Sequence, residues 1–354
     1  DISAQVAGAF IAVLCLAMLP KGKSTARSGH VIGMVVVAFG AGFLASLTLW
    51  VRVFKPLWPV FTIVAASSAI SGLALLAFLV ATGKAAVVPA GAWKWVFARG
   101  FAGMGAYFLS LVAVVEAGAP QGDVSSMQNV NIVVAALLGR TVLGERLDWC
   151  QFTAVCTSVA GALLVSQMHR WVLGASVEGF PVVGYLLGLL GGMVHGTLFI
   201  ASRKSQAVDP LVLTMSVTLQ EGFAMAMMIG SGFVTETSRD VLWDRPFGCL
   251  GLLLAYTVLN GLASALMSAG AQWCPAAISS TIATSVQVSL GYFCQVFLFG
   301  ESVEVATSFG AALMLFSVAM MALARLASDP ARSVLRQTIP YSDVDPRLMT
   351  ERSR

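Results

Sequence analysis

Polar side chains inside two apolar segments are the first candidates for chemistry in this chain. One set lies within residues 124–143 and the other within residues 276–299. In hydrocarbon a polar side chain is tolerated where it faces a partner or a wet cavity, so such residues mark candidate solute pathways. Their neutral donors and acceptors can hydrogen-bond sugar, nucleotide or amino-acid groups, and the alternative is that they join helices. The two sets contain Ser125, Gln128, Asn129, Asn131, Thr281, Thr284, Ser285 and Gln287.

Two titratable side chains lie near the middle of other apolar segments. Glu221 lies within residues 211–234, where an ionised acid costs at least about 3 kcal/mol, so we expect it to be protonated, paired or wet. It could carry a coupling proton or bind a cationic substrate group, or it could hold a structural hydrogen bond with Gln220 or another helix. His195, within residues 181–202, could form a relay with Glu221 if their helices face each other. A packed histidine with satisfied hydrogen bonds is the alternative.

Arg99 begins another apolar segment, residues 95–117. A guanidinium presents a planar fork to phosphate or carboxylate groups, which makes Arg99 a candidate substrate contact. Anchoring at the lipid headgroups is the alternative, as it is for Trp93 and Trp95 beside it.

The composition places all these residues in a membrane. Of 354 residues, 58% are hydrophobic and only 11% are charged. A helix needs about 20 mainly apolar residues to cross a bilayer, and ten segments meet that requirement. The predicted spans are residues 31–53, 57–81, 95–117, 124–143, 149–168, 181–202, 211–234, 247–271, 276–299 and 304–326.

The charges and cysteines exclude several classes of protein. The net charge of +4 does not indicate a nucleic-acid partner, because the Lys and Arg residues flank the apolar segments. Placing the loop before residue 31 in the cytosol puts most Lys and Arg residues on the cytosolic side and predicts a cytosolic C-terminus. The six cysteines have neither disulfide-like nor metal-like spacing, so no metal and no cofactor is expected.

An internal repeat divides the chain into two halves. An offset of 156 residues places Gly144-Glu145 on Gly300-Glu301 and superimposes most of the polar positions named above, which favours the cavity interpretation. A five-helix repeat is odd, so the second copy must enter the membrane upside down, an architecture typical of transporters. Glu145 and Glu301 end their spans and are expected to cap or anchor loops.

The predicted fold is therefore an all-α polytopic membrane protein with ten transmembrane helices in two inverted repeats. The repeats cover residues 31–168 and 181–326, with a linker at 169–180 and a disordered cytosolic tail at 327–354. Residues 1–30 contain a short apolar run and a basic loop. We interpret the run as a remnant of a preceding repeat or the end of an incomplete sequence, with a cleaved signal peptide as the alternative.

Four short motifs between about residues 31 and 326 resemble the drug/metabolite transporter superfamily, in its EamA-like ten-helix branch. They are Ala98-Arg99-Gly100, Ala117-Gly118-Ala119-Pro120, Val142-Leu143-Gly144-Glu145-Arg146-Leu147 and Phe299-Gly300-Glu301. The family commonly has a proline inside the fourth and ninth helices, where this chain has Gln128 to Asn131 and Thr284 to Gln287. The resemblance implies a central cavity, peripheral fifth and tenth helices, and alternating access.

The sequence lacks the motifs that other functions would require. There is no H-E-x-x-H, G-x-S-x-G or phosphate-binding loop, and no filter-like TVGYG segment. The sequence therefore predicts a secondary transporter of a small polar organic solute rather than an enzyme, driven by protons or by exchange. An intramembrane enzyme or a non-transporting multi-pass protein is the alternative. The expected partners are a small-molecule substrate and the bilayer, with a homodimer left open and the membrane of residence undetermined.

Overall fold

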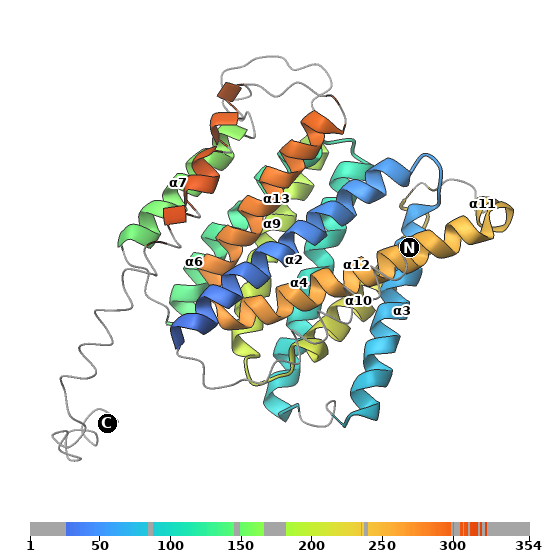
Figure 1. Cartoon of the computed structure of the whole chain (residues 1–354), viewed down its shortest axis with the longest axis horizontal. Helices are drawn as coiled ribbons and strands as arrows, with labels where there is room; N and C mark the ends of the chain where they lie inside the picture. Colours follow the sequence, from blue (N-terminus) through green and yellow to red (C-terminus); the bar gives the residue numbers. More distant parts are fainter. Residues whose placement is uncertain are drawn as a thin grey trace.

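Every regular secondary-structure element in the described part of the chain is a helix, including a short 3₁₀ helix, η2 (Ala90–Ala92). The computed structural model describes residues 26–83, 88–144, 149–165, 182–234, 236, 240–298, 300 and parts of 305–323. Its helices form one bundle (Figure 1). They are α2 (Ala26–Phe54), α3 (Val60–Ala81), α4 (Trp93–Val115), α5 (Gln121–Met127), α6 (Val130–Val142), α7 (Trp149–Val165), α9 (Val182–Lys204), α10 (Pro210–Gly230), α11 (Asp240–Asp244), α12 (Pro246–Trp273) and α13 (Ala276–Phe297).

Prolines and glycines set many of the helix boundaries. α10 and α12 have a proline in their first turn, where the missing N–H has no helical acceptor. The Asp209 side chain also accepts a hydrogen bond from Leu211 N at 2.9 Å, which caps α10. Gly144 and Gly300 have φ angles of 68° and 65°, a left-handed conformation that favours glycine after a helix. The repeated Gly-Glu pair therefore begins with a helix-ending glycine in both halves.

Glycine faces let α9 approach its neighbours closely. Gly184, Gly188, Gly192 and Gly196 recur every four residues and lie on one face of α9. A Cβ atom at Gly192 would lie 2.7 Å from the Gln128 backbone, so only glycine allows this contact. Such small-residue faces are a standard way of packing helices in membranes.

The predicted fourth span differs from the structure in one respect. It is not one continuous helix, since α5 ends at Met127 and α6 begins at Val130. Asn131 N and Ile132 N donate to the carbonyls three residues before them, at 2.9 and 3.0 Å, so the chain tightens there into a 3₁₀-like turn. The break lies where α9 packs against the Gln128 backbone.

The outer surface is suited to lipid. Six described helices are long and apolar enough to cross a membrane: Ile32–Phe54, Val60–Ala81, Ala90–Val115, Val182–Lys204, Pro210–Gly230 and Pro246–Trp273. Phe39, Phe101, Phe223 and Leu254 point outward and are exposed, as lipid-facing side chains are. The protein is thus an integral multi-pass membrane protein.

The two ends of the bundle differ in charge among the described residues. The end where α4 begins, here called the basic end, carries Lys94, Arg140, Arg203 and Lys204, together with Asp209. The opposite end, here called the acidic end, carries Glu116, Asp123, Glu236, Asp240 and Asp244, together with Arg52, Lys55 and Arg245.

Several predictions fall on residues outside the described ranges. These are the apolar run within residues 1–20, Glu145, Glu301, the linker at 169–180 and the tail at 327–354. Helical pieces between 305 and 323 lie beside α7 at one edge of the bundle (Figure 1), and a Cβ atom at Gly161 would lie 2.6 Å from the carbonyl oxygen of Gly310.

Candidate functional site

A polar cavity lies in the middle of the bundle. Its walls come from α2, α4, α5, α9, α10, α12 and α13. Helices on both sides of the predicted repeat boundary therefore contribute to it. Its polar and titratable lining residues are Thr48, Arg99, Tyr107, Ser110, Gln121, Ser125, Gln128, His195, Glu221, Asn260, Ser264 and Gln287.

Arg99 lies in the cavity wall rather than at the bundle surface. Its side chain is 2% exposed, and Nη2 donates to Ser268 Oγ at 3.2 Å. Thr214 Oγ1 donates to the same hydroxyl at 3.3 Å, so Ser268 connects α4, α10 and α12. Arg99 Nε has no hydrogen-bond partner among the described residues. Its burial does not fit the headgroup-anchor alternative.

Glu221 lies in the same cavity and is held by α12. Both carboxylate oxygens accept from Asn260 Nδ2, at 3.5 and 3.2 Å, and Asn260 Nδ2 also donates to Ser68 Oγ at 3.1 Å. The alternative partner Gln220 instead donates to Ser216 Oγ and to the carbonyl of Phe97, at 3.0 and 3.3 Å. Glu221 therefore makes its hydrogen bond with another helix and not with Gln220, the two structural alternatives that the sequence left open.

A pair of tyrosines lies beside this group. The hydroxyls of Tyr107 on α4 and Tyr256 on α12 are hydrogen-bonded to each other, and both side chains are buried. Tyr107 also lines the cavity. The carboxyl of Glu221 thus faces a wall of neutral hydrogen-bonding groups on α4 and α12.

His195 lies across the cavity, on α9. Its Nδ1 lies 3.2 Å from Asn131 Nδ2, and its ring stacks at a tilt on Phe199 with 5.2 Å between centroids. His195 and Glu221 line one cavity, but each has its hydrogen bonds with another residue. The structure does not form a direct relay between them.

The two predicted polar sets divide into cavity-lining residues and helix-joining residues. Ser125, Gln128 and Gln287 line the cavity. Asn131 and Thr284 instead exchange hydrogen bonds at 2.7 and 2.9 Å, which join α6 to α13. The remaining three bond locally or to the segment near residue 314, and they are Asn129, Thr281 and Ser285.

The lining of the cavity extends toward the acidic end, while at the basic end hydrogen bonds hold α12 to the loop between α9 and α10. Gln121, the first residue of α5, lies at the acidic end of the lining. At the basic end Gln272 Nε2 donates to the carbonyls of Ser205 and Val208 at 2.9 and 3.0 Å. Arg203 Nη1 in turn donates to the Gln272 carbonyl at 2.9 Å.

Sequence reasoning missed several lining residues. Asn260, Tyr107 and Gln121 were not among the predicted site residues, although each contributes a polar group to the wall. Asn260 had one signal, since it is an amide inside the apolar segment 247–271. Tyr107 had none, because an aromatic residue in a span is an ordinary packing residue.

Comparison with known proteins identifies the first half of the chain. Residues 31–167 match the model of the EamA-like transporter family. This segment is an EamA-like transporter domain. The resemblance expected from the sequence motifs is confirmed, and the EamA-like domain contributes α2, α4 and α5 to the cavity wall. A match to a transporter family also suggests a non-enzymatic role.

The fold of this chain is similar to that of a solved structure. A solved structure titled "Crystal structure of protein" matches with a TM-score of 0.60 and 20% sequence identity. The match covers 85% of this chain and 99% of that chain, so the similarity of fold extends well beyond the first domain. A search of curated protein sequences found no match.

Proposed function

We propose that this protein is a secondary transporter that carries a small polar organic solute through the central cavity by alternating access. The observation that supports it best is the cavity itself, with polar groups from both halves facing it. The amides of Gln128 and Gln287 make no hydrogen bond with a described residue, and both side chains are 6% exposed. Buried amides without protein partners are suited to a polar solute.

The proposal includes ten transmembrane helices in two inverted repeats, residues 31–168 and 181–326. Helix packing supports this arrangement, because α4 packs along α9 as α2 packs along α12. Under a two-fold operation that exchanges the repeats, these two contacts are equivalent. α3 and α10 pack on each other through Gly72 and Gly222, as two equivalent helices at an axis would. Inverted repeats with a central site are typical of carriers.

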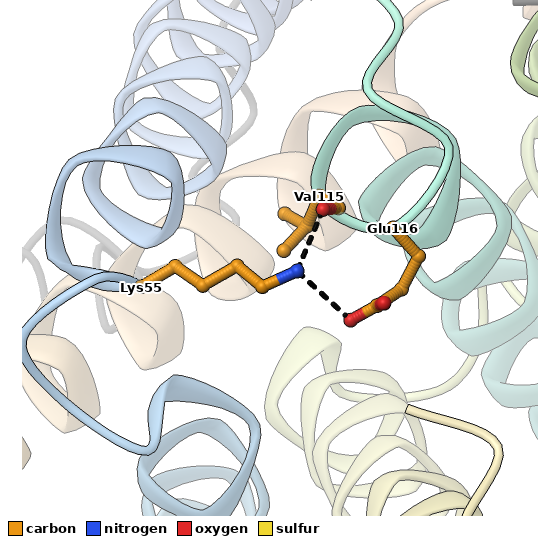
Figure 2. Close-up of polar contacts among 3 residues, drawn as sticks. All are labelled: Lys55, Val115 and Glu116. Atoms are coloured by element: carbon orange, nitrogen blue, oxygen red, sulfur yellow. Dashed lines mark hydrogen bonds and ion pairs between the residues drawn. The ribbon is translucent and has the colours of Figure 1, made fainter. Parts of the chain in front are cut away.

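Two equivalent residues support the inversion at the level of side chains. Glu116 ends α4 at the acidic end, and Lys55 in the α2–α3 loop donates to its carboxylate at 3.1 Å and to the Val115 carbonyl at 2.7 Å (Figure 2). Gln272, 156 residues later, ends α12 at the basic end and donates to the α9–α10 loop. Each ties the third helix of its half to the loop between the first two, at opposite ends.

The charge difference between the ends supports an orientation. Loops rich in Lys and Arg stay on the cytosolic side of a membrane, so we assign the basic end to the cytosol. The Gln121 side of the cavity then lies away from the cytosol. Glu221 is our candidate for proton coupling, because it is a cavity carboxyl held by a neutral amide.

The test is uptake of a labelled metabolite panel into proteoliposomes, with and without a pH gradient. The parent chain, Glu221→Gln and the control Asp244→Asn are compared, the control because Asp244 is exposed at the acidic end. We expect saturable uptake by all three, with a higher half-saturating concentration in Glu221→Gln, and loss of the pH-gradient effect in that variant alone. Intact coupling in Glu221→Gln would assign Glu221 to structure, and no uptake across the panel would contradict the carrier assignment.

A further inference from the structure

The cavity contains a buried cation without a counter-ion among the described residues. Arg99 has one side-chain hydrogen bond, to the neutral hydroxyl of Ser268, and its Nε has no partner. Among the described residues no carboxylate forms an ion pair with it. A buried charge without a partner is costly, so the site favours a ligand that brings a negative group.

A carboxyl group faces the same cavity farther along the bundle. A Cβ atom at Gly103 would lie 3.0 Å from Arg99 Nη1 and 3.2 Å from the Val217 side chain, so the guanidinium lies at the level of Val217. Glu221 follows Val217 on α10 by one helical turn, a rise of about 6 Å. The two groups are therefore neighbours in one cavity, but they do not form an ion pair.

The rest of the wall at this depth is neutral. Gln128 and Gln287 add free amides, Asn260 holds the Glu221 carboxyl, and His195 is engaged with Asn131. Arg99 and Glu221 both line this cavity, can carry full charges of opposite sign, and lie about one turn of α10 apart along the bundle. A ligand with one charge would leave the other buried group uncompensated.

We infer that the solute is a small zwitterion, an amino-carboxylate whose charged groups are separated by one to three carbon atoms. Its carboxylate contacts the Arg99 guanidinium and its ammonium group contacts the Glu221 carboxylate. The free amides of Gln128 and Gln287 contact the remaining polar atoms. This inference rests on the proposed carrier function, since it assigns a substrate class to the same cavity.

The test is equilibrium binding to the purified full-length chain in detergent, measured by calorimetry. The probes are glycine, β-alanine and 4-aminobutyrate as zwitterions, with propionate and propylamine as fragments that carry one charge each. We expect β-alanine to bind at least about tenfold more tightly than either fragment, because loss of one charge leaves a buried partner unpaired. Equal binding of propionate would reduce the site to an anion site, and equal binding of propylamine to a cation site. Either result, or binding by none of the zwitterions, overturns the inference.

Variants assign the two ends of the ligand. Glu221→Gln is expected to bring the affinity for β-alanine down to that for propionate, whereas Arg99→Lys keeps the charge and retains part of the carboxylate affinity. Arg140→Gln and Asp244→Asn remove exposed charges outside the cavity and should leave binding unchanged. Uptake assays separate the two claims. Binding of zwitterions without uptake would contradict the carrier alone, and uptake of solutes that are not zwitterions would contradict the substrate class alone.

Discussion

Two equivalent pairs of residues in the middle of the bundle behave differently. Asn131 on α6 and Thr284 on α13 exchange hydrogen bonds and hold these two helices together. The repeat offset maps this pair onto Gln287 and Gln128, which face the cavity and do not bond to each other. The bonded pair lies nearer the basic end and the open pair nearer the acidic end. If the halves exchange conformations, the bonded and open pairs should exchange as well, which would move access to the other side.

Thiol labelling tests most directly whether the two pairs differ in accessibility. In a background without the six native cysteines, Gln128→Cys should react with a water-soluble thiol reagent at least about tenfold faster than Thr284→Cys. The reason is that residue 128 lines the cavity, whereas residue 284 belongs to the bonded pair and is fully buried. Equal rates would show that the two pairs are equally accessible and would remove the proposed asymmetry.

Alanine substitutions should separate binding from stability. Gln287→Ala should lower uptake efficiency about tenfold, equivalent to about 1.4 kcal/mol, with little change in melting temperature. Its equivalent Asn131→Ala leaves His195 and Thr284 without their partner, so unfolding should become easier by about 1–3 kcal/mol. Uptake kinetics and thermal unfolding of both variants provide the check. A stability loss in Gln287→Ala alone would reverse the assignment.

Substitutions at the two ends of the bundle should differ less in their effect on stability than the two substitutions above. Lys55 and Glu116 have side chains that are 27% and 18% exposed, so Lys55→Met should cost at most about 1 kcal/mol, and less at high salt. Gln272→Ala at the basic end removes buried hydrogen bonds to two carbonyls and should cost more, with no salt dependence. Melting temperatures at low and high salt measure both. A larger loss of stability in Lys55→Met than in Gln272→Ala would contradict the view that the basic end is the more strongly held one.

The positions of the helices were readable from the sequence because long apolar segments and proline or glycine boundaries are local signals. The break between α5 and α6 was not, since it accompanies the close approach of Gly192, a contact between segments far apart in sequence. The same limit applied to the site. Arg99, Gln128 and Glu221 stood out as polar residues in apolar segments, but Asn131 and Gln128 looked alike until the structure gave one a partner.

The partner of Glu221 shows the limit most clearly. Asn260 lies 39 residues away on another helix, and nothing local in the sequence indicates that the two side chains meet. Interhelical hydrogen bonds in membranes depend on the packing of whole helices, which sequence patterns do not specify.

Counterflow in proteoliposomes tests the central claim, that the cavity carries its solute by alternating access. Vesicles containing the parent chain are loaded with unlabelled β-alanine or another solute that the uptake panel identifies, and entry of the labelled solute is timed. A carrier returns faster when it is loaded, so preloading should accelerate labelled uptake and uptake should saturate. Entry that does not saturate and is not accelerated by preloaded solute would instead indicate a channel and contradict the account.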